Sequence, residues 1–160
     1  GKLRAMLQAY VDFGFHETNV YNLMFTWSVP KYEDYVGTDL EKTANQELLT
    51  ALKVSALFMQ AAADVIDAGE AAPDPGQAPT FPVEALRTYV IHLWCTLHGY
   101  ISGCNNTLLN YIHPAPQSLE QPVINLLIHT LQQMKHEVQT SGASALHYLS
   151  PDNPPARQPF

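Results

Sequence analysis

The stretch that decides the fold is residues 82–111, PVEALRTYVIHLWCTLHGYISGCNNTLLNY. Apolar side chains recur in it every three or four residues, the spacing of one face of an α-helix. Thr80 stands at the N-cap position, and Pro82 and Glu84 fall in the first turn, where both are favoured. The pattern predicts one long helix that reaches Tyr111, with an apolar stripe at Leu86, Val90, Leu93, Leu97, Ile101, Cys104 and Leu108.

Residues 119–139 predict a second long helix. Ser118–Gln121 before it has the pattern of a capping box, in which two side chains three residues apart bond to exposed backbone N–H groups. The apolar positions cover more than one stripe: Val123, Ile124, Leu126, Leu127, Ile128, Leu131, Met134 and Val138. Because one domain cannot cover two such helices, we expect both to pair with their copies across a two-fold axis, as a four-helix interface.

Three helices are expected earlier in the chain. The first carries Leu3, Leu7, Tyr10 and Phe13 on one face and is interrupted at Gly14. A short second helix over 20–27 is apolar all round, which predicts burial on most sides, and Pro30 ends it. A capping box at 38–41 opens the third, which Gly69 would stop. The stripe expected on this third helix is Leu49, Leu52, Ala56, Met59, Ala63 and Ile66.

Proline and glycine mark the boundaries of this organisation. Residues 69–80 hold three prolines and two glycines, so they predict a loop. From residue 150 the chain is again rich in proline and cannot be helical. We therefore expect one all-α domain over residues 1–149 and a tail over residues 150–160, with no β-strand in either.

Charge and composition limit the partners. The chain has 8 Lys+Arg against 15 Asp+Glu, a net charge of −7, so it lacks the cations that bind a phosphate backbone. We expect no measurable affinity for duplex DNA. No run of 18 apolar residues occurs, so no transmembrane helix is expected. Cys95 and Cys104 lie in an apolar helical stretch and predict buried, reduced thiols of a cytoplasmic protein. The chain opens directly on a helical pattern, without an initiator Met or a signal peptide, as a piece of a longer protein does.

Three motifs occur in a fixed order. They are YVDFGFH at residues 10–16, VYNLMF at 20–25 and WCTLHG at 94–99. Together they resemble the C-terminal domain of TetR-family transcription regulators, in the subclass named for its Trp-His-Gly signature, over about residues 1–140. The resemblance implies an effector-binding and dimerisation domain that binds DNA only through an N-terminal helix-turn-helix, which is not in this sequence. An effector in the helical core would then change the spacing of the DNA-binding heads.

Two interpretations of Trp94 and His98 stay open. The two residues stand four apart, so they share one helix face. Either Trp94 fills the core and His98 is a hydrogen-bonded core histidine, or both line an effector cavity. The early aromatic residues carry the same ambiguity. The candidate ligand-binding residues are Tyr10, Phe13, Tyr21, Phe25, Met59, Trp94 and His98. Such a cavity implies a small apolar or amphipathic effector.

Signals for catalysis and for metals are weak. Seven histidines occur, but no spacing places ligands on one face as metal motifs do. No nucleophile elbow, phosphate-binding loop or activated cysteine is evident, so neither a catalytic residue nor a cofactor is expected. The alternative that stays open is a small helical enzyme or cofactor-carrying bundle that uses the same cavity.

Overall fold

A computed structural model describes residues 1–28, 30, 32–67, 81–142, 145–146 and 149. The expectation of an all-α chain is confirmed, because every regular element in these residues is helical. The five α-helices are α1 (Lys2–His16), α2 (Thr18–Tyr21), α3 (Glu41–Asp67), α4 (Val83–Asn105) and α5 (Glu120–Ser141). A π-helical turn, η1 (Asn22–Thr26), and three 3₁₀ turns, η2 (Tyr32–Tyr35), η3 (Leu108–Tyr111) and η4 (Pro116–Leu119), lie between them.

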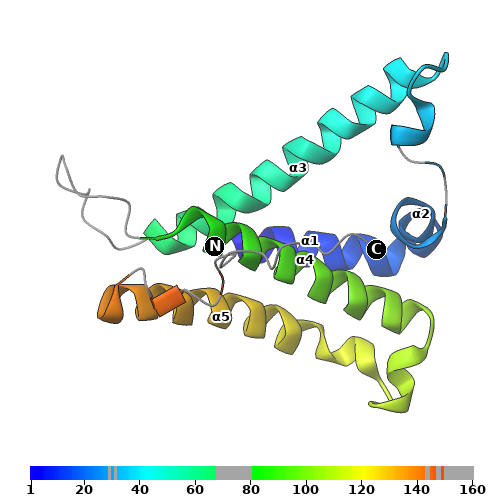
Figure 1. Ribbon diagram of the computed structural model, residues 1–160. Coiled ribbons are helices and arrows are strands. Elements are labelled where there is room, and N and C mark those ends of the chain that lie inside the picture. Colours follow the sequence, from blue (N-terminus) through cyan, green and yellow to red (C-terminus); the bar gives the residue numbers. More distant parts are fainter. Residues whose placement is uncertain (29, 31, 68–80, 143–144, 147–148, 150–160) are drawn as a thin grey trace, which may run out of the picture.

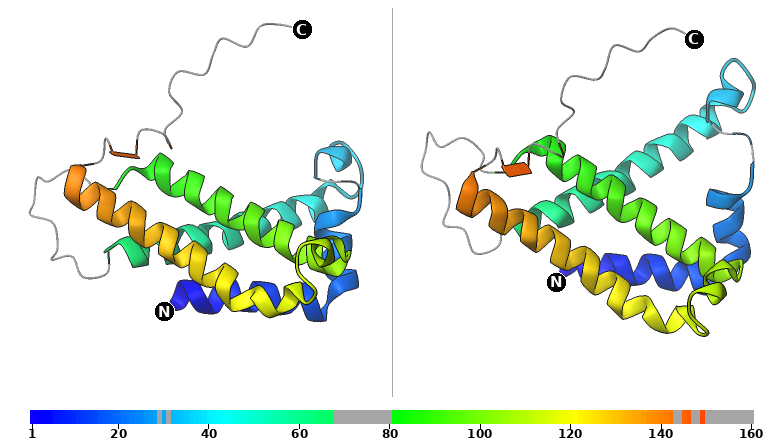
Figure 2. Two further views of the ribbon diagram at one scale, coloured as in Figure 1. Left: turned by 90° about the horizontal axis from the view of Figure 1, so that it is seen from below. Right: turned by 60° about the horizontal axis from the view of Figure 1, so that its bottom comes forward.

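Helices α1, α4 and α5 form the tightly packed part of the molecule, which we call the base. Figure 1 shows α1 beside α4, with α5 along the other side of α4, and Figure 2 shows that α4 and α5 run antiparallel. The largest buried aliphatic side chains lie between these helices, each contributing roughly 1.5–3 kcal/mol. They are Leu3, Leu7, Val11, Leu93, Leu97, Ile101, Ile124, Leu127 and Leu131.

The crossing of α1 and α4 depends on a glycine. A Cβ atom on Gly14 would lie 2.5 Å from Cγ2 of Ile101, closer than atoms can pack. The Gly14 carbonyl also accepts a 2.9 Å hydrogen bond from Nδ2 of Asn105 at the end of α4. Gly14 lies inside α1, which continues to His16. It therefore allows the two helices to approach each other closely. The expected interruption of the first helix at Gly14 is wrong.

Helix α4 ends earlier than the sequence predicted. It stops at Asn105, and Thr107 adopts a left-handed conformation with φ of 60° before the 3₁₀ turn η3. The turn folds Leu109 against Gly103, where a Cβ atom would lie 2.8 Å from the leucine Cγ. The expected extension to Tyr111 is wrong because this packing is not visible in the apolar spacing. Leu93, Leu97, Ile101 and Cys104 of the expected stripe are buried, as predicted.

The start of α5 also differs from the prediction. The helix begins at Glu120 after η4, and no side chain caps it. The Ser118 hydroxyl donates instead to the Ala115 carbonyl, at 2.7 Å, so the expected capping box does not form. Buried tyrosines of α4 anchor this part of the chain. Tyr89 Oη donates to the Leu127 carbonyl at 2.9 Å, and Tyr100 Oη donates to the Pro116 carbonyl at 3.0 Å.

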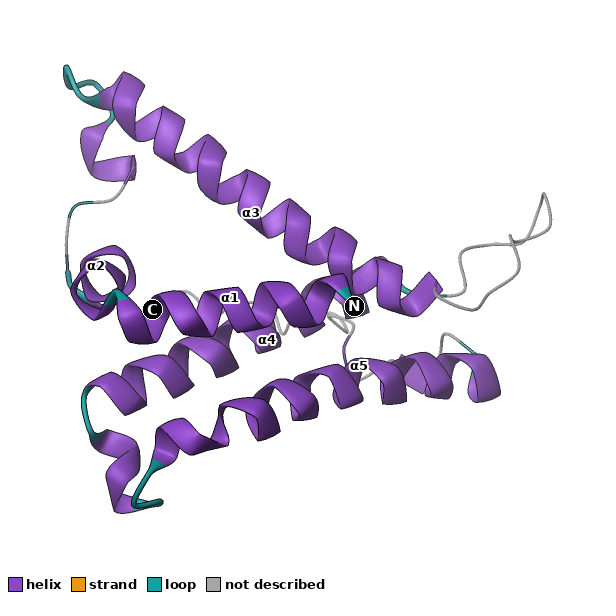
Figure 3. Cartoon of the chain, turned by 180° about the vertical axis from the view of Figure 1, so that it is seen from behind, coloured by secondary structure: helices purple, strands orange, loops and turns teal. Residues whose placement is uncertain are grey.

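Helix α3 leaves the base at an angle, and with α2, η1 and η2 it forms what we call the arm. Figure 3 shows α3 close to α1 at one end and well apart from it at the other. Its C-terminal turns pack on the base through Ala61, Ala62 and Ile66, and Ala44 is buried at the opposite end, where α3 meets η2. Every residue from 46 to 57 is exposed, so the expected burial of Leu49, Leu52 and Ala56 is wrong.

The capping box of α3 forms in a shifted version. The Leu40 amide donates to Thr38 Oγ1 at 3.2 Å, and the Gly37 amide donates to Glu41 Oε2 at 2.8 Å. The expected residues therefore act together, but the regular helix begins only at Glu41.

By length and composition alone, α3 is also long and apolar enough to cross a membrane, and it is the one such helix among the described residues. The expectation of no spanning helix rested on an unbroken apolar run, whereas α3 has polar residues interspersed among its apolar ones.

The short helix before Trp27 is not buried on most sides. Tyr21 is fully buried, but Val20, Leu23, Met24 and Trp27 are all about half exposed. The helical turn ends at Thr26, with Trp27 already extended at φ −76° and ψ 146°, before Pro30. The expected stop at Gly69, loop over 69–80, cap at Thr80 and tail over 150–160 lie outside the described residues.

Candidate functional site

Aromatic residues from α1, α2, η1, α3 and α4 meet in one cluster. We call Tyr10, Phe13, Tyr21, Phe25, Phe58, Trp94 and His98 the aromatic cluster, since each ring contacts at least one other, with centroids 5.0–6.5 Å apart. Six of the seven candidate ligand-binding residues are in it. Rings at such separations gain about 0.5–1.5 kcal/mol per pair beyond the area they bury.

The π-helical turn η1 and the residue before it supply two rings of the cluster, Phe25 and Tyr21. Tyr21 precedes η1, whose wider turn closes with a 2.8 Å bond from the Trp27 amide to the Asn22 carbonyl. Tyr21 and Phe25 stand four residues apart, and their ring centroids are 5.0 Å apart. Single π-helical turns often occur at functional sites, because the extra residue changes where side chains point.

Helix α4 contributes a stacked pair to the cluster. The Trp94 and His98 rings are nearly parallel, at 8°, with centroids 5.2 Å apart. Phe25 meets both rings at a steep angle. Trp94 remains 43% exposed although it forms this stack, so it is the outer wall of the cluster. The predicted sharing of one helix face by these two residues is thus seen directly.

Polar atoms connect the rings. Tyr21 Oη lies 2.8 Å from Nδ1 of His98 and 3.4 Å from Oη of Tyr10. Burial raises the pKa of Tyr10, against the lowering effect of its hydrogen bonds to Tyr21 and Trp94. Burial also raises the pKa of Tyr21, and the neighbouring Tyr10 raises it further. Both phenols are therefore neutral hydrogen-bonding groups at physiological pH.

Met59 is the one candidate without an aromatic ring, and it is half-buried on α3. Its neighbour Phe58 has a ring that is perpendicular to that of Tyr10, with the centroids 6.5 Å apart. Phe58 and Met59 are both half-buried, so the half-buried part of α3 includes the predicted stripe at Met59 and the position before it. Phe58 was visible as an aromatic residue in the sequence, but the stripe favoured its neighbour.

Asn22 is a polar residue that the sequence did not single out. Its Oδ1 atom is buried and has no hydrogen-bond partner, the one such side-chain atom among the described residues. A buried acceptor without a donor costs about 1–3 kcal/mol. It lies in η1 beside Tyr21, next to the cluster. The spacing of apolar residues carries no signal for an atom of this kind.

The two hollows with described volumes lie away from the cluster. One of about 380 Å³ lies where the first residues of α1 meet α3 and α5, beside Lys2, Asp64 and Lys135. Another of about 270 Å³ lies between the end of α4 and η4, beside Cys104 and Asn110. Neither hollow is lined by a residue of the aromatic cluster.

The two cysteines of α4 differ in exposure. Cys104 is buried, as expected, but Cys95 is exposed, because it lies on the side of α4 turned away from the base. Burial raises the pKa of the Cys104 thiol, and its hydrogen bond to Tyr100 opposes that shift. Within the described residues, no group of three or more His, Cys, Asp or Glu side chains is placed to hold a metal ion.

Helices α4 and α5 also present apolar residues outward. Ile91 and Leu126 are each 65% exposed. A Cβ atom added to Gly99 would meet nothing within 4 Å, so no neighbour in its own chain explains this glycine. A glycine inside a helix costs about 1 kcal/mol relative to alanine. The packing reason expected for the helix glycines is thus seen for Gly103, whereas none is seen for Gly99 among the described residues.

Comparison with known proteins gives one match. Residues 3–121 match the family described as "Tetracyclin repressor-like, C-terminal domain". The matched range runs from the first turn of α1 to the first turn of α5 and includes the whole aromatic cluster. No curated protein and no solved structure matches the chain.

Proposed function

Because the chain belongs to the family of tetracyclin repressor-like C-terminal domains, we propose that it binds a small apolar or amphipathic effector at the aromatic cluster. The family supports a ligand-binding and dimerisation role in a transcription regulator. Membership confirms the family that the three sequence motifs predicted, and the Trp-His-Gly subclass stays a prediction. As regulators of this family are soluble, we place the domain in the cytoplasm.

The observation that carries the proposal is the hydrogen bond between Tyr21 and His98 inside the cluster. Ligand sites are mostly apolar and contain a few placed polar groups that orient the ligand. The cluster has this composition, and Trp94 leaves its outer side open. An effector would enter there by displacing η1. The apolar surface that remains exposed on Leu23, Met24 and Trp27 would then become its cover.

Coupling to the rest of the regulator would pass through α1. This helix places Tyr10 and Phe13 in the cluster, and at its start Lys2 Nζ lies 3.7 Å from Asp64 Oδ2 of α3. A ligand that separates the rings would shift α1 relative to α3. It regulates only if it binds two arrangements of these helices with different affinity. The DNA-binding heads that respond would lie outside residues 1–160, because this acidic chain cannot bind a phosphate backbone well.

Dimerisation would use the outward faces of α4 and α5, over residues 83–105 and 120–141. Exposed Ile91 and Leu126 provide apolar area, and the empty space at Gly99 admits a helix of a second copy. A two-fold pairing of this kind is self-complementary and would fix the distance between the heads. No catalytic role is proposed, in keeping with a family that is generally not enzymatic.

The test uses N-phenyl-1-naphthylamine, an apolar dye that fluoresces when it leaves water. We expect saturable enhancement with the intact chain, and at least fivefold weaker binding in Phe25→Ala, which removes a ring of the cluster. Phe15→Ala is the matched control, since its ring packs on Tyr100 outside the cluster. It should bind the dye within twofold of the unmodified chain. Equal losses in both variants, or no saturable binding, would refute the site.

A further inference from the structure

One row of residues on α4 is open along most of its length and covered at its end. Residues spaced four apart form a ridge of a helix, and this ridge consists of Ile91, Cys95, Gly99 and Gly103. The first three are exposed, and a Cβ atom on Gly99 would meet nothing within 4 Å. Gly103 is buried, and Leu109 of η3 packs on it. The turn η3 therefore closes the end of an otherwise open row.

Backbone hydrogen bonds and packing hold η3 in this place. The Asn110 amide donates to the Thr107 carbonyl at 3.2 Å, and the Ile112 amide donates to the Leu109 carbonyl at 3.0 Å. A Cβ atom on Gly103 would lie 2.8 Å from Cγ of Leu109, so the glycine makes room for the leucine side chain. The shape of η3 is thus set within the single chain, which lowers the entropy cost of an association that uses it.

Two large apolar side chains of this turn are exposed. Leu108 is 62% exposed, and Ile112, which directly follows η3, is 82% exposed. We call Leu108 and Ile112 the turn patch. Figure 3 shows η3 at the end of the base, where the chain turns from α4 into α5. Because Leu109 packs on Gly103, one helical turn from the open Gly99, η3 adjoins the open row. Exposed apolar surface gathered in this way marks an interaction site.

The same part of the chain is nearly free of charged residues. Between Arg87 and Lys135 the one Asp, Glu, Lys or Arg is Glu120, whose carboxylate accepts a hydrogen bond from Gln8 of α1. The net charge of −7 therefore comes almost entirely from the rest of the chain. Charged residues are depleted at the centre of protein–protein interfaces. Nucleic acid and anionic membrane surfaces would instead need lysine or arginine here. The composition of this segment thus fits a protein partner.

Resting on the dimerisation proposed above, we propose that the turn patch is part of the interface with a second copy of this chain. The family supports a dimerisation role, and a second copy is acidic as well. Two copies repel each other over most of their surface, but not where both lack charges. A helix of the second copy that lies along the open row reaches η3 one turn beyond Gly99. Leu108 and Ile112 then contact that copy, and η3 sets the register of the two chains.

The test measures self-association of the chain by sedimentation equilibrium at micromolar concentrations. We expect a dimer, and a dissociation constant raised about tenfold or more in Leu108→Glu and in Ile112→Glu, because each places a charge in an apolar contact. Leu108→Ala, which adds no charge, should raise it about threefold to tenfold. Leu52→Glu is the matched control, since this leucine of α3 is 56% exposed and the same charge is added. It should change the constant by no more than about twofold. Because all three positions are exposed, every variant should keep the circular dichroism of the intact chain.

The outcomes separate this inference from the dimerisation on which it rests. An intact chain that sediments as a monomer overturns both. A dimer whose dissociation constant stays within about twofold in Leu108→Glu and Ile112→Glu overturns the contact at η3 and leaves the dimerisation standing. Equal weakening by Leu52→Glu also overturns that contact, because the added charge, and not its position, would then be the cause.

Discussion

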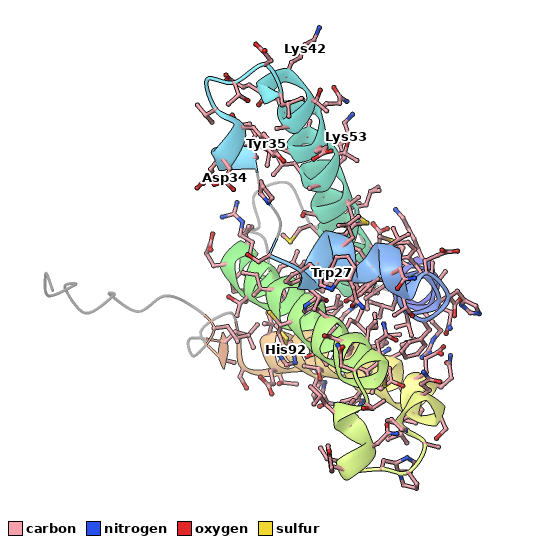
Figure 4. The ribbon with its side chains drawn as sticks, turned by 90° about the vertical axis from the view of Figure 1, so that its right-hand side faces the viewer. Trp27, Asp34, Tyr35, Lys42, Lys53 and His92 are labelled. Carbon is pink, nitrogen blue, oxygen red and sulfur yellow. The ribbon has the colours of Figure 1, made fainter. Side chains whose placement is uncertain are left out.

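The base and the arm contain the same kinds of apolar residue, but the base buries them and the middle of the arm exposes them. Leu7 of α1 is 0% exposed, surrounded by α4 and α5, whereas Leu52 in the middle of α3 is 56% exposed. Both leucines lie on helices of comparable apolar character. Figure 4 shows Lys42 and Lys53 extending from α3 away from the rest of the molecule, so this helix has a solvated side as well. In the base, other helices pack against the apolar side chains, whereas in the middle of α3 the apolar side chains are exposed.

The comparison shows which part of the molecule covers its own apolar side chains. The base buries its large aliphatic residues without help. The arm is attached to the base by the C-terminal turns of α3 and through the aromatic cluster, and no residue from 46 to 57 is buried. Segments with few buried contacts open at low free-energy cost, and binding sites are drawn from them. We therefore expect the base to hold the fold and the arm to respond to the effector.

The largest expected effect comes from truncating the base. Leu7→Ala should lower the free energy of unfolding by about 2–5 kcal/mol, through lost burial and the cavity left behind. Leu52→Ala is the matched change in the arm and should cost no more than about 0.5 kcal/mol. Urea unfolding followed by circular dichroism measures both. Similar losses for the two leucines would mean that the middle of α3 is packed in solution.

A glycine pair gives the next largest effect. Gly14→Ala should destabilise the chain by about 1–3 kcal/mol, because its Cβ atom would collide with Ile101. Gly99→Ala meets no atom of its own chain, so it should stabilise the monomer by about 0.5–1 kcal/mol through helix propensity. If a second copy packs there, the same change should weaken the dimer in light scattering. An unchanged dimer would place the interface away from Gly99.

The smallest effect concerns a buried hydroxyl of the base. Tyr89→Phe removes the donor to the Leu127 carbonyl and should cost about 1 kcal/mol at pH 7. Burial raises the pKa of Tyr89 above its ordinary 10.0, so folding favours the neutral phenol. That contribution is fully present below pH 10 and is lost as the pH rises above it.

The urea midpoint of the unmodified chain should therefore stay level to about pH 9 and fall above pH 10, and in Tyr89→Phe it should fall less steeply. Tyr111→Phe is the control, because that side chain is almost fully exposed, and it should follow the unmodified chain. A parallel fall in Tyr89→Phe would assign the alkaline loss to other tyrosines.

The helical elements of the base were predictable because their own spacing encodes them. Leu3 and Leu7 in α1, Leu93 and Leu97 in α4, and Leu127 in α5 were expected on buried faces and are buried there. The meeting of Trp94 with His98 followed from their separation of four residues. What failed was decided by neighbours distant in sequence. Helix α4 ends at Asn105 because Leu109 packs on Gly103, and no local pattern announces that contact.

Helical periodicity and short motifs are local properties, and from them alone the all-α class, the five helices and the family were predicted. The contact of Phe58 with Tyr10, and the hydrogen bonds of Tyr21 with Tyr10 and His98, depend on how distant helices meet, so they appear only in the tertiary structure. The same holds for the middle of α3, which is exposed among the described residues. An apolar stripe predicts that one face of a helix is covered, but the angle at which two helices cross determines which of its turns are in contact.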